Sequence, residues 1–205
     1  MCLVNVGERH DPEINNDLCD TRFLTQNCRG LNNLLKRNKV FNNFKNKADI
    51  IFVQESHSTK AIEASWKKMW GGEIIFSHGT SASRGCMILF KACVDVVIHE
   101  KREDPCGRYI FLKCTINGKK MFLINVYAPN TETEHFSFME NFFNTASDFH
   151  DDEFFNVVAG GDWNFIEDLE KDKKGGLNKL WIKSVTTMGI IKDYFDMSDI
   201  WRAKN

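Results

Sequence analysis

The 205-residue sequence lacks the features that place a protein in a membrane or outside the cell. It has no run of roughly 20 apolar residues, the length that a membrane-spanning helix needs. Its first residues lack the basic and then apolar pattern of a signal peptide. Its 7 Cys are an odd number and form no C-x-x-C pair, which argues against zinc sites and fits reduced thiols. We therefore expect a nuclear or cytoplasmic protein that is not secreted and has no membrane partner.

Neither sign of charge dominates the sequence, and proline is scarce. A formal net charge of -1 argues against a globally basic nucleic-acid-binding protein, although a local basic patch is compatible with it. With 42% hydrophobic residues, 17 Phe and only 3 Pro, the composition is that of a folded chain. One domain of this size buries roughly 70% of its unfolded surface. We expect residues 1–20 to form an unstructured lead-in and residues 21–205 to form one domain. We also expect three cysteines in apolar runs to be buried, namely Cys86, Cys93 and Cys114.

Segments typical of strands alternate with segments typical of helices along most of the chain. Asn117-Gly118 lies between two strand-like runs and predicts a tight hairpin. The mixture of hairpins with a β-α-β opening favours sheets that pack on each other under helices. The predicted strands cover 23–26, 50–54, 73–77, 84–90, 93–100, 109–117, 120–126 and 156–160, and the predicted helices cover 31–47, 60–70, 136–149 and 177–189.

Four apolar runs end at polar residues suited to phosphate chemistry. Asn27, Glu55 and Tyr127 each follow such a run, and the fourth ends in Gly-Gly before Asp162 and Asn164. In an extended chain, residues i and i+2 point to the same side, so Asp162 and Asn164 can reach one site. If the strands are neighbours, all five side chains meet at one edge of a sheet.

Hydrolysis of a phosphate ester assisted by Mg²⁺ needs such a set. Mg²⁺ binds one or two carboxylates together with waters and substrate phosphate, which suits Glu55 as a ligand. Asp162 would orient or deprotonate the attacking water, while Asn27, Asn164 and the Tyr127 hydroxyl would donate to phosphate oxygens. Taken one at a time, the same residues also fit a solvated loop acid, a core aromatic and ordinary turn residues.

Five motifs together resemble a known family. The sequence resembles the endonuclease/exonuclease/phosphatase superfamily and, more narrowly, the apurinic-type endonuclease domain of LINE-type (non-LTR) retrotransposons. The motifs are TQNCRGL at 25–31, VQESH at 53–57, GTSASRGCMILF at 79–90, INVYAPN at 124–130 and GGDWN at 160–164.

The resemblance implies both a fold and an activity. The fold is a four-layer α/β sandwich of the deoxyribonuclease-I type, with two mixed sheets face to face and helices outside. The activity is DNA nicking that depends on Mg²⁺, or on Mn²⁺ in its place, and that primes reverse transcription. The DNA substrate is the expected partner, and a reverse transcriptase domain is expected in the parent element. By position, the metal site would hold Glu55 and Asn27, the phosphate would be bound by Tyr127 and Asn164, and Asp162 would position the water.

In the resembling family a further strand and a Ser-Asp-His motif follow the segment matched by Asp199-Ile200-Trp201-Arg202. We therefore expect the domain to be truncated at its C-terminus, with its last strands missing. Loss of that histidine would lower the nicking rate by roughly 10² to 10⁴. His57, two residues after Glu55, is expected to lie beside the site but not to replace the histidine of the Ser-Asp-His motif. Two alternatives remain: a catalytically dead remnant that binds metal or DNA weakly, and a phosphatase of the same superfamily.

Overall fold

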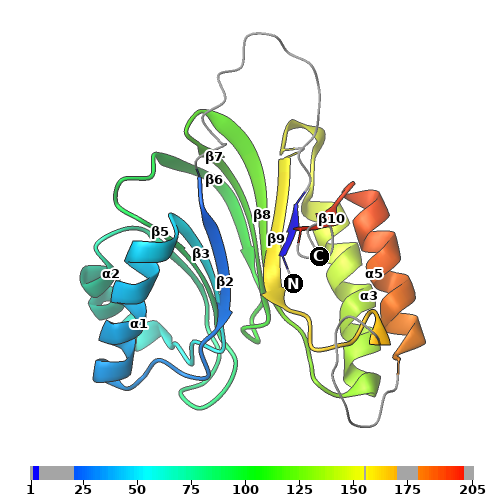
Figure 1. Ribbon diagram of the computed structural model, residues 1–205, viewed down its shortest axis with the longest axis horizontal. Helices are drawn as coiled ribbons and strands as arrows, with labels where there is room; N and C mark the ends of the chain where they lie inside the picture. Colours follow the sequence, from blue (N-terminus) through cyan, green and yellow to red (C-terminus); the bar gives the residue numbers. More distant parts are fainter. Residues whose placement is uncertain (1, 5–20, 155, 170–179, 201–205) are drawn as a thin grey trace.

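Two β-sheets lie face to face at the centre of the fold (Figure 1). The computed structural model describes residues 2–4, 21–154, 156–169 and 180–200. One sheet has four strands and is covered by helices from the first half of the chain. The other has six strands and is covered by helices from the second half.

The smaller sheet comes from the first half of the chain. Its strands, in spatial order, are β2 (Phe23–Asn27), β3 (Ile50–Gln54), β5 (Cys86–Phe90) and β4 (Ile74–Ser77). Strands β2 and β3 are parallel, and the other pairs are antiparallel. Helix α1 (Leu34–Lys47) connects the parallel pair and begins after Asn33, whose side chain accepts a hydrogen bond from Lys36 N. A short 3-10 turn at Lys60–Ile62 leads into α2 (Glu63–Trp70).

The larger sheet joins the second half of the chain to its first residues. Its strands, in spatial order, are β10 (Ser198–Asp199), β1 (Cys2–Val4), β9 (Asn156–Asp162), β8 (Lys119–Tyr127), β7 (Tyr109–Ile116) and β6 (Val96–Glu103). Strands β8 and β9 are parallel, and the other neighbours are antiparallel. A 3-10 turn at Asp152–Phe154 precedes β9. Helices α3 (Glu132–Phe149) and α5 (Ile182–Tyr194) pack on the outer face.

Alternate residues of each strand separate the core into layers. In β3, Ile51 and Val53 face the helices, where they pack in one cluster with Trp66. Ile50 and Phe52 face the opposite way and pack against side chains of the larger sheet. This period of two is that of a strand with both faces covered. The layers are therefore helix, sheet, sheet and helix, and the predicted α/β sandwich with two mixed sheets face to face is confirmed.

The hairpin prediction is also confirmed, whereas the lead-in prediction is wrong for three residues. Asn117 and Gly118 have φ of 48° and 80° and close the turn between β7 and β8. Residues Cys2–Val4 form β1, which pairs with both β9 and β10. A three-residue strand held by partners more than 150 residues away leaves no local pattern. The rest of the lead-in, residue 1 and residues 5–20, lies outside the described residues.

Two smaller predictions differ from the structure. The last helix, predicted at 177–189, is α5 at Ile182–Tyr194, and residues 177–179 lie outside the described residues. Cys93 is exposed because it lies in the turn between β5 and β6, whereas Cys86 and Cys114 are buried as expected. Within the described residues, no helix is long and apolar enough to cross a membrane.

Candidate active site

The strands that carry the predicted site residues end at one edge of the sandwich. Strands β2 and β3 run parallel in one sheet, and β8 and β9 run parallel in the other. In Figure 1 the arrowheads of β2 and β9 lie at the lower ends of the two sheets, and these two strands are in contact. The carboxyl ends of all four strands therefore meet, as the sequence predicts.

Asn27 links the two carboxylates of the site. Its amide nitrogen donates to Glu55 Oε1 at 2.7 Å and to Asp162 Oδ2 at 2.9 Å. Its amide oxygen accepts from Arg29 N at 3.0 Å. Two carboxylates attract an NH₂ group and repel a carbonyl oxygen, so this orientation follows from the charges. One residue at the end of β2 thereby fixes acids from β3 and β9, which belong to different sheets.

Tyr127 completes the contacts around Glu55. Its hydroxyl lies close enough to the Glu55 carboxylate for the charge of Glu55 to act on it. Burial, followed by the charge and hydrogen bond of Glu55, raises the pKa of Tyr127 to about 12. The guanidinium of Arg108 stacks over the Tyr127 ring at 5.2 Å from its centroid. Tyr127 is therefore a protonated phenol at neutral pH, able to donate a hydrogen bond to an oxyanion.

A turn brings Asn164 to Asp162. Asn164 has a left-handed φ of 51°, so the chain is not extended there, and the expected alternation along a strand is the wrong reason for their proximity. Asn164 N donates to Asp162 Oδ1 at 3.3 Å, as in an Asx turn. The Asn164 side chain donates to Ala128 O at 2.8 Å, which ties the turn to the end of β8.

A buried histidine on α3 contacts the main chain of the same turn. His135 Nε2 lies 2.7 Å from the carbonyl oxygen of Trp163, and His135 Nδ1 lies 2.8 Å from Ser184 Oγ. Because a carbonyl only accepts, Nε2 carries the proton and Ser184 donates to Nδ1. Burial lowers the pKa of His135, partly offset by its bond to Trp163. This histidine connects α3 and α5 to the residue between Asp162 and Asn164.

The two glycines before Asp162 are required by close packing. A Cβ on Gly160 would lie 2.5 Å from Phe52 Cδ2 in the facing sheet. A Cβ on Gly161 would lie 2.4 Å from both Cγ1 and the carbonyl oxygen of Val126 on β8. Any larger residue would push the end of β9 away from its neighbours. The Gly-Gly pair therefore sets the position of Asp162.

A buried amide pair beneath the site was not predicted. Gln54 Nε2 donates to Asn125 Oδ1 at 2.7 Å, and Asn125 Nδ2 donates to the carbonyl oxygens of Val53 and Met87 at 3.0 and 2.8 Å. The pair joins the two sheets near the carboxyl ends of β3 and β8, next to Glu55 and Tyr127. The signal for it is present in the sequence, because both amides interrupt apolar runs just before Glu55 or Tyr127.

Left-handed residues gather in the loops at this edge. Glu55 and His57 have φ of 50° and 57°, and Arg29 and Arg84 have φ of 48° and 60°. Each such conformation costs about 1–3 kcal/mol and persists only where its surroundings enforce it. His57 lies beside the site, with Nε2 3.9 Å from Glu55 Oε2 and its ring packed on Gly30.

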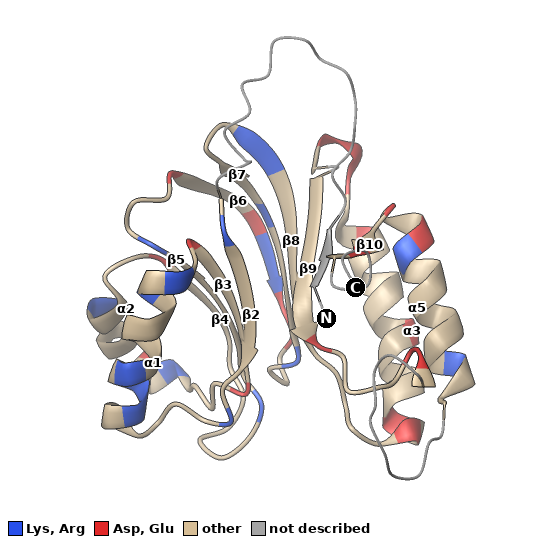
Figure 2. Ribbon diagram, in the orientation of Figure 1, with Lys and Arg blue, Asp and Glu red and all other residues tan. Residues whose placement is uncertain are grey.

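Basic residues flank the two acids. Arg29 follows β2, and Arg84 accepts a main-chain hydrogen bond from His57. Arg108, over Tyr127, belongs to the neighbouring turn, where Gly85 N donates to Gly107 O. Figure 2 shows Lys and Arg segments in loops at the same end of the sandwich as the acidic end of β9. Positive charge therefore borders the carboxylates even though the whole chain has a formal net charge of -1.

The donors suit a hard divalent cation. Within the described part of the chain, no group of three or more His, Cys, Asp and Glu side chains is arranged to hold a metal. Two convergent carboxylates, Glu55 and Asp162, fit Mg²⁺ or Mn²⁺, which keep waters and take substrate oxygens. Asn27 as a metal ligand stays a prediction, because here its nitrogen faces the carboxylates and its oxygen faces Arg29 N.

Solved structures of AP endonucleases and of a 3′ phosphatase share this architecture. An AP endonuclease from Archaeoglobus fulgidus aligns at 18% identity over 83% of this chain and 70% of that one, with a TM-score of 0.58. The AP endonuclease LMAP from Leishmania major aligns at 14% identity over 89% of this chain and 69% of that one, with a TM-score of 0.60. The 3′ phosphatase NExo from Neisseria, bound to a product DNA hairpin, aligns at 22% identity over 84% of this chain and 70% of that one, with a TM-score of 0.58. The fold is thus the deoxyribonuclease-I-like sandwich of AP endonucleases.

A comparison of sequences relates the chain to a transposon protein. No protein-family model matches the chain. The transposon TX1 uncharacterized 149 kDa protein of Xenopus laevis is 30% identical over 156 residues, which are 76% of this chain and 12% of that protein. The chain is thus related in sequence to a transposon protein, of which it spans about 12% of the length, and it has the fold of AP endonucleases; together these findings support the predicted resemblance to an endonuclease-type domain of a retrotransposon.

Proposed function

We propose that the chain is a Mg²⁺-dependent DNA endonuclease domain that hydrolyses one phosphodiester bond. The observation that carries the proposal is the Asn27 bridge, which holds Glu55 and Asp162 together with Tyr127 and Asn164 at one edge. Two acids, a phenol and an amide are the groups that metal-assisted attack of water on phosphorus requires. The arginines beside them are suited to the flanking phosphates.

The side chains divide the chemistry between them. Asp162 accepts hydrogen bonds on both oxygens, from Asn27 and from Asn164 N, which fix the orientation in which its carboxyl group would position the attacking water. The phenol of Tyr127 and the Asn164 amide donate to the phosphate oxygens that gain charge. Glu55 would hold Mg²⁺, which when bound neutralises that charge as a Lewis acid.

DNA is the proposed substrate because of the relatives as well as the site. The Neisseria enzyme is described with bound product DNA, and the Xenopus relative is a transposon protein. Since the chain spans 12% of the length of that relative, a reverse transcriptase partner in the parent element is part of the proposal. Nicking of this kind would supply the 3′ hydroxyl from which such an enzyme extends.

Slow turnover by the 205-residue chain is also proposed. Within the described residues, His57 is a histidine in contact with a site acid, with Nε2 3.9 Å from Glu55 Oε2. In that part of the chain no hydrogen bond joins a histidine side chain to Tyr127 or Asn164, so we propose that protonation of the leaving oxygen is slow. The same observation favours a second candidate function, binding of metal and DNA without hydrolysis.

The test is nicking of supercoiled plasmid in Mg²⁺, Mn²⁺ or EDTA. We expect slow conversion to open circles that stops in EDTA and falls at least about 10²-fold in Glu55→Gln and Asp162→Asn. Asp148→Asn is the control, because that side chain is 82% exposed on α3. Nicking that survives EDTA or Glu55→Gln would contradict the proposal. Glu55-dependent DNA binding without nicking would establish the second candidate, and release of phosphate from a 3′-phosphorylated oligonucleotide would indicate a phosphatase.

A further inference from the structure

A chain of hydrogen bonds leads from the Glu55 loop to the outside of the smaller sheet. Ser56 Oγ donates to Ser58 Oγ at 3.0 Å, and Ser58 Oγ lies 3.1 Å from His78 Nδ1. His78 Nε2 lies 2.7 Å from Glu63 Oε1 on α2. Both serines are fully buried, with 0% of their surface exposed. The chain therefore crosses the interior between the candidate active site and the first turn of α2.

The charge of Glu63 fixes the direction of its bond with His78, and the other directions follow for a neutral imidazole. Burial acts to raise the pKa of Glu63, but hydrogen bonds from His78 and Lys60 outweigh it and lower the pKa. Glu63 is therefore a carboxylate, and His78 Nε2 must carry a proton to donate to it. In the neutral imidazole, Nδ1 then accepts from Ser58, which in turn accepts from Ser56. All four side chains have partners, as buried polar groups require.

The loop that begins this chain needs support. Glu55 and His57, on either side of Ser56, both have left-handed backbones, at φ of 50° and 57°. Ser56 N donates to Gly85 O at 2.9 Å, and a Cβ on Gly85 would lie 2.6 Å from Ser56 Oγ. The Ser56 side chain is thus locked between Gly85 and Ser58. Because Ser56 is covalently next to Glu55, whatever fixes Ser56 also fixes the Glu55 backbone.

We propose that His78 is a positioning residue of the candidate active site, which holds the Glu55 turn through Ser58 and Ser56. The inference rests on the proposed function, since it takes Glu55 to be the ligand of the divalent cation. Groups that orient a metal ligand through a hydrogen bond typically change metal affinity by about 10- to 100-fold when they are removed. His78 acts over two further residues, so the lower end of that range applies.

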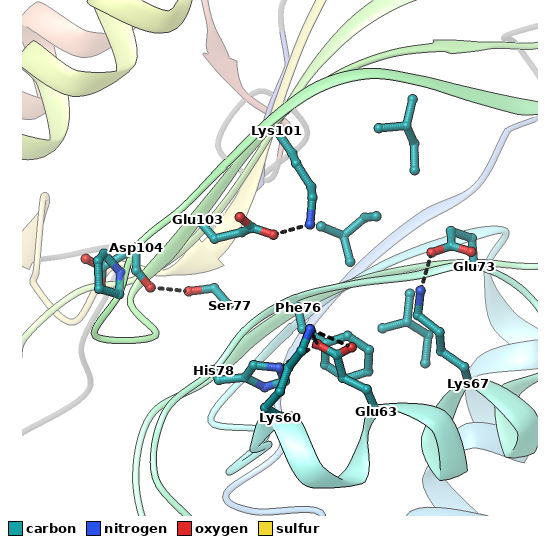
Figure 3. Close-up of a pocket in the computed structure, with 14 residues that line it drawn as sticks. Lys60, Glu63, Lys67, Glu73, Phe76, Ser77, His78, Lys101, Glu103 and Asp104 are labelled. Atoms are coloured by element: carbon teal, nitrogen blue, oxygen red, sulfur yellow. Dashed lines mark hydrogen bonds and ion pairs between the residues drawn. The ribbon is translucent and has the colours of Figure 1, made fainter.

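The imidazole lies at the edge of an open cavity. Its ring stacks on Phe76 with centroids 5.2 Å apart. The cavity, about 520 Å³ in volume, is lined by α2, β4 and β6 and includes His78, Glu63 and Lys60 (Figure 3). Truncation of His78 to alanine would open its place to this cavity, so that free imidazole in solution can enter. Chemical rescue is therefore a practical test.

The first measurement follows the turn itself and needs no metal. In His78→Ala and in Ser58→Ala, we expect the amides of Ser56 and His57 to exchange hydrogen at least about tenfold faster than in the unaltered chain. The two changes interrupt one chain, so the double variant should be no faster than the faster single variant. His99→Ala is the matched control, because His99 is an exposed histidine on β6 whose hydrogen bond goes to Thr115 on β7. Unchanged exchange in both single variants would overturn the proposal.

The second measurement is Mn²⁺ affinity by titration calorimetry. We expect His78→Ala to raise the Kd for Mn²⁺ by roughly tenfold and to keep a Tm close to that of His99→Ala. Free imidazole should bring the Kd of His78→Ala back toward that of the unaltered chain. A purely structural role would lower the Tm and would not respond to imidazole. Mn²⁺ binding that is equal in His78→Ala and in the unaltered chain would also overturn the proposal.

The proposed function and the positioning role fail in different ways. If Glu55→Gln binds Mn²⁺ as tightly as the unaltered chain, the assignment of Glu55 to the metal is wrong. In that case the exchange rates of Ser56 and His57 alone decide whether His78 positions the turn. If Glu55→Gln loses Mn²⁺ while His78→Ala keeps it, the metal site stands and the positioning role is wrong.

Discussion

A single amide bridges the two like charges of the candidate site. Glu55 and Asp162 come from different sheets, and without a partner between them their carboxylates would repel each other. The NH₂ of Asn27 donates to both, so one residue converts a repulsive pair into a fixed one. The same pair is where a divalent cation would bind. Asn27 and a metal therefore stabilise the same arrangement of acids.

Asn27→Asp separates these two contributions. The change replaces a shared donor by a third carboxylate, and we expect it to destabilise the metal-free protein by about 2–3 kcal/mol. Mg²⁺ should then raise the Tm more in Asn27→Asp than in the unaltered chain, because a bound cation offsets the added charge. Scanning fluorimetry with and without Mg²⁺ measures both effects. Asn156→Asp, at the far end of β9, is the control and should show no Mg²⁺-dependent gain.

At the scale of elements, an ionic cluster joins three strands of the smaller sheet at the strand ends remote from the candidate site. Asp49, just before β3, accepts from Arg22 N and Nε at 3.0 and 3.2 Å and from Lys91 Nζ at 3.0 Å. Arg22 precedes β2 and Lys91 follows β5. Main-chain bonds reinforce the contact, with Asp49 N to Arg22 O at 2.8 Å and Lys91 N to Asp49 O at 3.0 Å. This cluster ties the starts of β2 and β3, the two strands that end at the site, to the end of β5.

Acid should weaken this cluster selectively. Burial acts to raise the pKa of Asp49, but Arg22 and Lys91 outweigh it and hold the pKa at about 2, below the ordinary 3.8. A carboxyl with a lowered pKa stabilises the fold above pH 4, and this contribution is lost as the pH falls toward 2.

We expect Asp49→Asn to destabilise the fold at neutral pH, because Arg22 and Lys91 lose a charged partner. The loss should be only about 1–2 kcal/mol, since solvent screens the half-exposed Arg22. The gap between variant and unaltered chain should narrow as the pH falls from 4 toward 2. Urea unfolding across this pH range measures it. Asp148→Asn, 82% exposed, should be neutral throughout, and a gap for Asp49→Asn that is independent of pH would contradict the assignment.

Sequence patterns located the site residues better than they located the contacts between distant parts of the chain. The strands that end in Asn27, Glu55, Tyr127 and Asp162 are apolar runs stopped by a polar residue, a local signal, and the structure brings those four side chains together. Strand β1 depends on partners distant in sequence, so no window of residues contains the information. The Gln54–Asn125 pair is similar, because either amide alone reads as a defect in a strand, and only the contact between sheets explains both.

At the scale of the whole molecule, the site depends on how closely two separate sheets approach. Its acids lie on opposite sides of the gap between the sheets. The Gln54–Asn125 bond at 2.7 Å crosses that gap, and Gly160 lets the Phe52 ring rest on the backbone of β9. A change that widens the gap would therefore separate Glu55 from Asp162 without touching either.

Gly160→Ala tests this dependence of the site on sheet spacing. The added methyl would meet the Phe52 ring at 2.5 Å, and we expect a loss of about 1–3 kcal/mol in the free energy of unfolding. Gly189→Ala is the matched control, since nothing lies within 4 Å of its Cβ on α5. That change should stabilise the protein by up to about 1 kcal/mol through helix propensity. Phe52→Leu combined with Gly160→Ala should be less destabilising than the sum of the two single changes, because a smaller, flexible side chain yields to the methyl. Additive losses, measured by urea unfolding, would show that the gap between the sheets does not limit residue 160.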